Sequence, residues 1–267
     1  MKHSYVHGYS KKQLIRLLDQ AKTLSGLLHQ GTRYPRGSRV LEAGCGVGAQ
    51  TVILARNNRG AHFTSVDVSE KSIRCAGRLV KKNRIANVEL KQADILDLPF
   101  ADESFDHVFV CFVLEHLRNP GEGLRKLLRV LRKGGSITVI EGDHGSCFFH
   151  PETEAARLVW KCLVEIQEEL GCDSLIGRRL SPLLKKAKLR RIQVSPRMVY
   201  VDRTVPEWVT GFIKKTIIAM VQGVRAQAIE SGRIREKIWR TGIRDLYKTA
   251  SPGGTFCYTF FKGVAWK

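Results

Sequence analysis

The chain lacks any apolar run that approaches the roughly 18–20 uninterrupted residues needed to cross a membrane. Its start leads from Met1 into polar sequence without the apolar core of a signal peptide. The seven cysteines are odd in number and form no C-x-x-C pair, which argues against a disulfide framework. We therefore expect a globular protein of the cytoplasm, with no membrane span and no bound metal.

Acidic residues are scarce, because 25 Asp and Glu stand against 45 Lys and Arg and leave a net charge of +20. Such an excess can neutralise the phosphates of a nucleic acid. The basic residues are spread along predicted helices, however, and neither a basic tail nor an aromatic-interleaved patch for base stacking is present. A solvated basic surface is thus favoured, and a nucleic-acid partner stays open as the alternative.

The strongest motif is the run VLEAGCGVG at residues 40–48, which ends a predicted strand in a glycine turn. Glycine has no Cβ, so such a turn lets the backbone come very close to a ligand. Asp67 follows the next apolar run, where a carboxylate can accept the hydrogen bonds of a ribose diol. Asp94 follows the run after that. This pattern predicts a nucleoside cofactor.

Hydrophobic periodicity predicts an alternation of strands and helices along the first half of the chain. Strands are expected at residues 39–42, 61–68, 88–92, 105–111, 136–141, 191–201 and 255–266. Helices are expected at residues 10–29, 49–57, 69–83, 124–131, 152–170, 180–187, 206–230 and 235–249. Strands alternating with helices predict an α/β protein with a doubly wound, mostly parallel sheet.

The pattern changes after residue 142, and the chain divides accordingly. We expect an N-terminal helical cap over 1–37, a cofactor-binding core over 38–142 and a helical substrate cap over 143–190. The last two strands lie in 191–267 and belong to the same domain as the core. The segment between them is far longer than ordinary loops, which predicts an inserted helical lid over 205–250.

The glycine run alone does not identify the cofactor. GCGVGA at 44–49 satisfies the dinucleotide pattern G-x-G-x-x-[GA], and Asp67 lies where such enzymes place their ribose acid. A second acid at Asp94 suits the amino group of an adenine lying across three strand ends. The sequence LRKGG at 131–135 leads directly into a strand, and a strong strand closes the chain.

Together these features resemble the class I S-adenosylmethionine-dependent methyltransferases, in particular the type 11 group with the ubiquinone and menaquinone methyltransferases. The resemblance is dense over residues 38–142. Besides the glycine run, the matching segments are VDVS at 66–69, ADI at 93–95, LPF at 98–100, DESFD at 102–106 and LEHL at 114–117. The resemblance implies a seven-stranded Rossmann-like sheet with a reversed last strand, and S-adenosylmethionine as the cofactor.

The resemblance also implies which residues hold the cofactor. Asp67 would take the ribose hydroxyls, Asp94 the adenine amine, and Glu42 would brace the turn or reach the ammonium group. Other residues would line the space around the adenine or the donated methyl group, and an N-terminal residue would fold over the cofactor. The expected cofactor-binding residues are Tyr9, Glu42, Gly44, Gly46, Asp67, Val68, Asp94, Ile95, Cys111 and Phe112.

Polar residues after the fourth and fifth strands are candidates for the chemistry, since ligands bind at the carboxyl ends of parallel strands. A general base is needed only if the methyl acceptor must lose a proton to react. The catalytic candidates are His116, Asp143 and His144. The substrate-binding candidates are Glu141, His150, Tyr200 and Tyr258, with Phe148 and Phe149 beside the tyrosines in an aromatic wall.

The acceptor is predicted to be a small molecule, with its O, N or C nucleophile left open. The segment VCFV at 110–113 lacks the two prolines typical of adenine-N6 enzymes after strand four, and no Pro-Cys dipeptide marks a cytosine-C5 enzyme. Methylation of a tRNA, an rRNA or a protein stays an alternative. A non-catalytic module that only binds S-adenosylmethionine is another. A homodimer also stays open.

Overall fold

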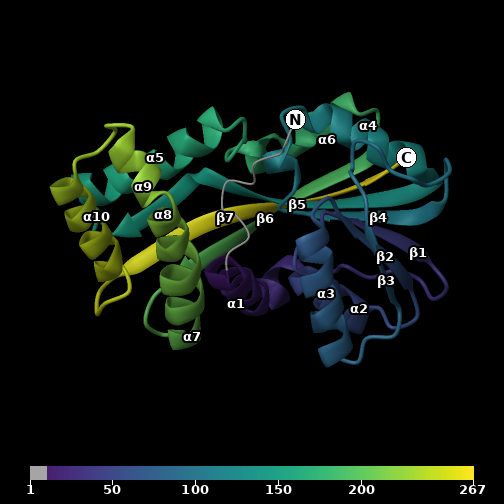
Figure 1. The fold of residues 1–267 in the computed structure, drawn as a ribbon, viewed down its shortest axis with the longest axis horizontal. Helices are drawn as coiled ribbons and strands as arrows, with labels where there is room; N and C mark the ends of the chain where they lie inside the picture. Colours follow the sequence, from purple (N-terminus) through teal and green to yellow (C-terminus); the bar gives the residue numbers. More distant parts are fainter. Residues whose placement is uncertain (1–10) are drawn as a thin grey trace. The chain divides into compact units, whose positions relative to one another are not determined.

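The computed structural model describes residues 11–267, with the side chains of the first helix from residue 14 onward. The described residues form a seven-stranded sheet in the order β3-β2-β1-β4-β5-β7-β6 (Figure 1). The strands are β1 Arg39–Ala43, β2 His62–Asp67, β3 Val88–Gln92, β4 Phe105–Cys111, β5 Leu131–His150, β6 Arg190–Val201 and β7 Thr255–Trp266.

The helices follow the predicted alternation through the first half of the chain. The α-helices are α1 Lys11–Leu28, α2 Ala49–Asn57, α3 Glu70–Lys82, α4 Pro120–Val130, α5 Glu154–Glu169, α6 Leu180–Lys186, α7 Pro206–Trp208, α8 Ala219–Gly223, α9 Arg225–Glu230 and α10 Glu236–Lys248. Two short 3₁₀ segments are η1 Leu114–His116 and η2 Ile176–Arg179, and η3 Val209–Ile218 is a wide π-helix.

Strands β3, β2, β1, β4 and β5 pair in parallel, each with its neighbour in the sheet. Strand β7 lies between β5 and β6 and runs in the opposite direction, with Gly134 N bonded to Lys267 O and Lys267 N to Gly135 O. The predicted α/β sheet of seven strands with a reversed last strand is therefore confirmed. Right-handed crossovers through helices are the usual connection between parallel neighbours.

The chain folds into two compact units, and β5, β6 and β7 each pass from one to the other. The sheet unit consists of Ser25–Gly142, Leu175–Arg197 and Phe260–Lys267. The helical unit consists of the described residues up to Leu24, together with Asp143–Ser174 and Met198–Thr259. The sequence boundaries 37, 142, 190 and 205–250 stay predictions.

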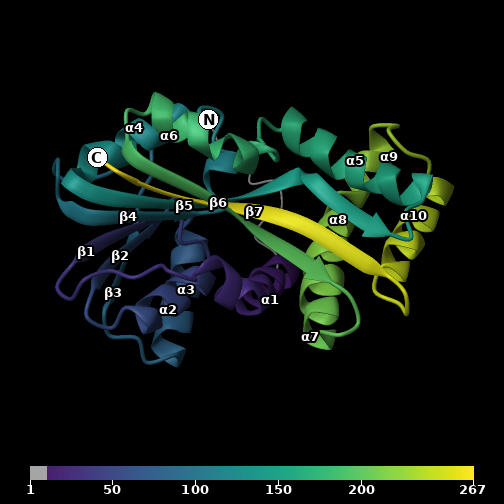
Figure 2. The same ribbon diagram turned by 180° about the vertical axis from the view of Figure 1, so that it is seen from behind.

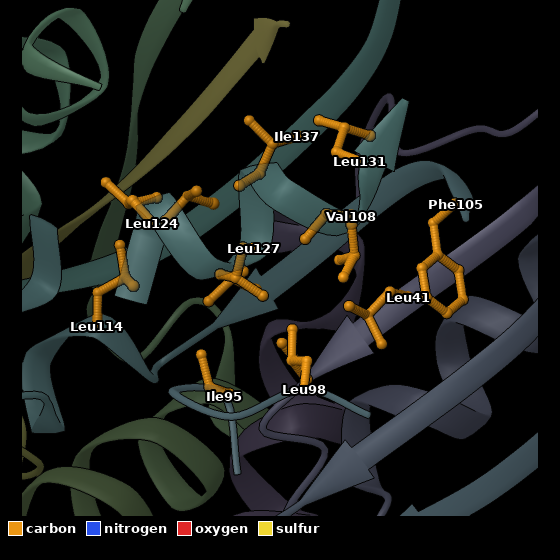
Figure 3. Packing of buried hydrophobic residues seen from close by; sticks show 14 of the residues in the cluster. Leu41, Ile95, Leu98, Phe105, Val108, Leu114, Leu124, Leu127, Leu131 and Ile137 are labelled. Carbon is orange, nitrogen blue, oxygen red and sulfur yellow. The ribbon is translucent and has the colours of Figure 1, made fainter. Parts of the chain in front are cut away.

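The core of the sheet unit lies between the sheet and helices α4 and α6, while α2 and α3 cover the opposite face (Figures 1 and 2). Helix α4 starts at Pro120, with the Asn119 side chain accepting a hydrogen bond from Glu122 N. Its fully buried Leu124 and Leu127 then pack toward Val108 of β4 (Figure 3). Each leucine buried in this way contributes about 1.5–3 kcal/mol, so this face ties β4 and its carboxyl end firmly in place.

The helical unit has an aromatic core of its own. The rings of Trp160, Phe212, Phe256 and Tyr258 contact one another, and Phe149 stacks on Phe256 with centroids 5.7 Å apart. Edge-on aromatic contacts of this kind add stability beyond the burial of area. Among the described residues, no helix is both long enough and apolar enough to span a bilayer.

Two predicted elements differ from the structure. Strand β5 runs from Leu131 to His150, whereas the sequence indicated only 136–141, because Gly134 and Gly135 read as a helix stop and the pattern changes after Glu141. A Cβ on Gly135 would lie 2.6 Å from Asp106 O, so this glycine serves close strand approach rather than a helix stop. The helix predicted over 206–230 is divided into α7, η3, α8 and α9, and Gly223 ends α8.

Gly242 marks a tight crossing of α10 on α5 within the helical unit. A Cβ there would lie 2.3 Å from Ala155 O. We expect Gly242→Ala to lower the free energy of unfolding by about 1–3 kcal/mol through overpacking. Gly26→Ala in α1 is the control, because a Cβ at Gly26 meets nothing within 4 Å; it should stabilise by about 0.5–1 kcal/mol. Urea unfolding measures the free energy of unfolding of both variants. If both were stabilised, Gly242 would not lie as close to Ala155 O as the structure shows.

Candidate functional site

The glycine turn connects β1 to α2 at the carboxyl edge of the sheet. The backbone N–H groups of Gly44 and Cys45 both donate to Val66 O at 2.8 Å, which anchors the turn to β2. Gly44 has φ 74°, and a Cβ there would lie 2.5 Å from Val113 Cγ2. A Cβ on Gly46 would meet nothing within 4 Å. Val113 therefore fills the space beside Gly44, whereas the space beside Gly46 is open.

Asp67 at the end of β2 holds the turn from the side. Its Oδ2 accepts a hydrogen bond from Gly46 N and its Oδ1 one from Ser69 N, both at 2.9 Å. Burial raises the pKa of Asp67, and these two N–H donors oppose the rise. A carboxylate can accept about four hydrogen bonds, so each oxygen retains capacity for one more donor.

Asp94 lies beyond the end of β3, beside Asp67 at the same edge. Ala93 N donates to Asp67 O at 3.1 Å, which joins the two strand ends. The Asp94 Oδ1 accepts a hydrogen bond from Leu96 N at 2.8 Å and thereby shapes its own turn. Ile95 is buried at 8% exposure, whereas Val68 is 47% exposed. Asp94 is thus followed by a buried apolar residue and Asp67 by an exposed one.

The end of β4 forms the next part of this edge. Cys111 is buried, and Phe112 has a φ of 58°, which is rare for a residue with a side chain. The strained turn is held by Phe112 N donating to Ile140 O at 2.9 Å. Backbone strain of this kind persists only where the surroundings enforce it, and it concentrates at functional sites.

Glu141, in the middle of β5, supports the same turn. Its Oε1 accepts hydrogen bonds from Val113 N at 3.0 Å and Leu114 N at 2.7 Å. Its Oε2 is buried and has no hydrogen-bond partner among the described residues. Burial, and next the neighbouring Glu115, raise the pKa of Glu141 well above its usual value. The carboxyl group therefore braces the β4 turn from a buried position.

Glu42 on β1 is 2% exposed, directly before the glycine turn. Its Oε2 accepts a hydrogen bond from Ser65 Oγ at 2.6 Å, which links β1 to β2 beneath the turn. Burial raises the pKa of Glu42 to about 7, against the hydrogen bonds of Ser65 and Thr51, and the charge of Asp67 adds to the rise. Glu42 was expected to brace the glycine turn or to reach the ammonium group of the cofactor. These contacts fit the bracing role.

The raised pKa makes a test of Glu42 possible. Because the folded protein binds this proton more tightly than the unfolded chain, stability is lost as pH rises from about 4.5 to about 7. The loss amounts to about 3 kcal/mol at 1.36 kcal/mol per pKa unit. Glu42→Gln should remove most of this fall in urea unfolding between pH 4 and 8. Glu89→Gln, at an exposed site of β3, should keep it; a flat profile in the unmodified protein would contradict the burial of a charge here.

His116, one of the catalytic candidates, ends η1 just after the β4 turn. Its Nε2 lies 3.5 Å from Glu115 Oε1, and its side chain is 20% exposed. His116 is thus in the same unit as the glycine turn, Asp67 and Asp94.

Asp143 and His144 belong to the helical unit, together with Tyr258. Asp143 Oδ1 accepts a hydrogen bond from Gly145 N at 3.0 Å. His144 Nδ1 lies 2.7 Å from the Tyr258 hydroxyl, and His144 O accepts a hydrogen bond from Trp160 Nε1 at 3.0 Å. The structure therefore brings together His144 and Tyr258, which the sequence analysis had listed for separate roles.

The other substrate candidates lie elsewhere. Tyr200 on β6 and Phe148 on β5 are 56% and 59% exposed, and His150 is exposed at the end of β5. Phe149 and Tyr258 are buried in the aromatic core instead. A single aromatic wall of these four rings is therefore wrong, because Phe148 and Phe149 are successive strand residues and face opposite sides. Tyr9 lies outside the described residues.

One buried cation in the sheet unit was not predicted from the sequence. Lys262 on β7 is 3% exposed, and its Nζ donates to Gln30 O at 2.7 Å and Thr32 Oγ1 at 2.5 Å. Burial, and next the charge of Arg197, lower the pKa of Lys262 to about 8. A single lysine within the apolar strand FCYTFFKGVAW was the available signal.

The chemistry of this edge suits a nucleoside. Bare backbone over Gly46 leaves space for a ligand, and Asp67 can still accept two hydroxyl donors. Asp94 lies at the next strand end, where it can accept from an exocyclic amine. Among the described residues, no three His, Cys, Asp or Glu side chains are grouped as metal ligands.

Comparison with known proteins places a methyltransferase domain over residues 41–139. A demethylmenaquinone methyltransferase of Clavibacter sepedonicus is 40% identical over 108 residues, which are 39% of this chain and 41% of that protein. Methyltransferase GfsG of Streptomyces halstedii is 29% identical over 126 residues, which are 47% and 45% of the two chains. The chain spans less than half the length of these curated relatives.

Solved structures resemble the chain over more of its length. Phosphoethanolamine N-methyltransferase 2 of Haemonchus contortus matches with a TM-score of 0.57 at 17% identity, over 92% of this chain and 52% of that one. This likeness concerns the fold alone. The glycine turn, Asp67, Asp94 and Phe112 all lie within residues 41–139, whereas Glu141 lies just beyond them.

Proposed function

We propose that this chain, whose residues 41–139 are a class I methyltransferase domain, transfers a methyl group to a small-molecule acceptor. The class of the domain specifies S-adenosylmethionine as the methyl donor. The observation that carries the assignment is one edge of the sheet. There the glycine turn, Asp67 and Asp94 follow three adjacent strands, with a bare backbone at Gly46.

Each group on this edge has a distinct task toward the cofactor. Asp67 keeps the turn in place through Gly46 N and accepts hydrogen bonds from the ribose hydroxyls with its remaining capacity. Asp94 accepts a hydrogen bond from the adenine amine, and Ile95 provides an apolar surface for the ring. Cys111 and Phe112 wall the methyl-donor region, and Glu141 and Glu42 hold the two turns rather than the ligand.

S-adenosylmethionine supplies a methyl group that is already activated on a sulfonium. What this chain's residues contribute is orientation and exclusion of water, which can account for most of the rate of such a transfer. Where the acceptor must lose a proton, a base is required. His116 is the first candidate, since it lies in the same unit as the cofactor contacts; Asp143 and His144 remain the second pair.

A small-molecule acceptor is supported by the relatives, of which several are named demethylmenaquinone methyltransferases. The deciding assay incubates the full chain with methyl-labelled S-adenosylmethionine and a metabolite extract, with and without nuclease. We expect label in small molecules whether or not nuclease is present. Label in RNA or protein alone would identify another acceptor class. Cofactor binding without any transfer would identify a binding module.

His116→Gln provides the accompanying test of the proposed base. Loss of general base catalysis should lower kcat by about 10²–10⁴-fold. The Kd for S-adenosylhomocysteine should change less than about threefold, which is about half of the 1.4 kcal/mol that corresponds to tenfold. Asp143→Asn and His144→Gln are measured in the same way. An equal loss of turnover and cofactor affinity would assign a residue to structure instead.

A further inference from the structure

A groove with a volume of about 620 Å³ lies on the helical unit, away from any residue assigned above. One wall is a single face of α10, where Trp239, Ile243 and Tyr247 recur at helical spacing. The other wall comes from α8 and α9, through Gln222 and Arg225. All of these residues belong to the helical unit.

The face of α10 toward the groove is not that of an ordinary solvated helix. The helix packs on α5 elsewhere, through the close approach of Gly242 to Ala155 O. Toward the groove, Trp239 is almost fully buried and Tyr247 is 40% exposed, with Ile243 half-buried between them. Aromatic residues and arginine are the types that dominate binding energy at recognition sites.

The charge around this apolar floor is strongly positive. Arg225 Nη2 and Arg240 Nε each donate to the same oxygen, Oε1 of Glu236, at 2.7 Å. These two hydrogen bonds lower the pKa of Glu236, so its carboxylate pairs with both guanidinium groups at the edge of the groove. Arg244 lies one turn beyond Arg240 and adds a third guanidinium. Three positive charges against one negative charge leave an excess of two.

We propose that this groove binds a small anionic amphiphile, an acyl chain or aromatic group bearing one carboxylate or phosphate. The volume lies within the range of roughly 300–1,000 Å³ that is usual for small-molecule sites. The apolar part contacts Ile243 and Tyr247, and the anionic group is held by the arginines, whose planar forks suit carboxylate and phosphate. Such a molecule reaches the groove either free or as part of a lipid surface.

Calorimetry on the full chain tests the charge requirement with four probes of one chain length. Decyl phosphate, decanoate, decanol and decyltrimethylammonium are titrated separately, each below its critical micelle concentration. We expect both anions to bind, and the alcohol and the cation to bind at least about 10-fold more weakly, since a hydrogen bond to a charged group contributes about 1.5–3 kcal/mol. Equal binding of decanol and decyl phosphate would overturn the proposal.

Substitutions of groove residues test whether the anions bind in the groove. Arg244→Gln should weaken decyl phosphate about 10-fold, and Tyr247→Ser should weaken both anions. Both side chains are exposed, so the variants should fold, as thermal unfolding will verify. Arg203→Gln, an exposed arginine of the same unit outside the groove, is the matched control and should leave binding unchanged. Unchanged decyl phosphate binding in Arg244→Gln would overturn the location.

Three further measurements separate the alternatives. Binding to vesicles of phosphatidic acid, but not phosphatidylcholine, that also depends on Arg244 would assign the anion to a lipid surface. RNA binding that depends on Arg244 without any binding of decyl phosphate would replace the proposal by a nucleic-acid site. A dimer that Tyr247→Ser converts to monomer would replace it by a subunit interface. The Kd for S-adenosylhomocysteine should stay constant throughout, which keeps this test independent of the proposed methyl transfer.

Discussion

Replacing Asp67 by alanine is expected to weaken the binding of S-adenosylhomocysteine by at least about 100-fold. Two effects add. The variant loses the acceptor for the ribose hydroxyls, and hydrogen bonds to a charged group contribute about 1.5–3 kcal/mol each. It also releases Gly46 N and Ser69 N, whose hydrogen bonds to the Asp67 carboxylate fix the glycine turn.

Calorimetry with the demethylated product measures this loss without turnover. Asp67→Asn separates the two effects, because its amide oxygen can still accept one backbone N–H while the charge is gone. We expect it to weaken binding less than alanine does. Asp97→Asn is the matched control, since Asp97 is an exposed acid in the turn after Asp94 and should leave the Kd unchanged. Product binding to Asp67→Ala at the original affinity would remove this edge as the nucleoside site.

Most of the sheet could be predicted from the sequence, because its strands are short apolar runs separated by amphipathic helices. The run 88–92 and the final strand 255–266 coincide with β3 and β7. Strand β5 was predicted too short, since its continuation past Gly142 is stabilised by pairing with distant strands and not by local propensity. The wide turns of η3 were not predicted either, because Gly211 and Thr216 read as ordinary helix residues.

The candidate site also contains contacts that the sequence predicted and contacts that it did not. The contacts of Asp67 with the glycine turn follow from the position of each at the end of a strand, which the sequence indicated. The positive φ of Phe112 and the bracing of its turn by Glu141 depend on long-range packing. The contact of His144 with Tyr258 joins residues 114 positions apart, so no local pattern could reveal it. Sequence predicted what sits at strand ends; it could not predict which buried polar groups meet.

The second large effect is expected at Gly46, where a side chain would occupy the ligand's space without disturbing the fold. A Cβ at Gly46 meets nothing within 4 Å, so Gly46→Leu should project into the region over the turn. Its φ of 53° lies in the left-handed region, which costs about 1–2 kcal/mol for a residue with a side chain. We therefore expect a folded protein that has lost at least about 100-fold in affinity for S-adenosylhomocysteine, a difference of nearly 3 kcal/mol.

Gly44→Ala is the informative comparison, because its Cβ would lie 2.5 Å from Val113 Cγ2. That variant should lose stability, by about 1–3 kcal/mol from overpacking in addition to its unfavourable φ, and Val113→Ala should restore part of it. The two glycines are two residues apart and share the left-handed backbone. If Gly46→Leu bound the product normally, the space over the turn would not be where the nucleoside lies. If it lost more stability than the cost of its left-handed φ, as Gly44→Ala is expected to do, the leucine would be clashing with packed atoms and the region over Gly46 would not be open space.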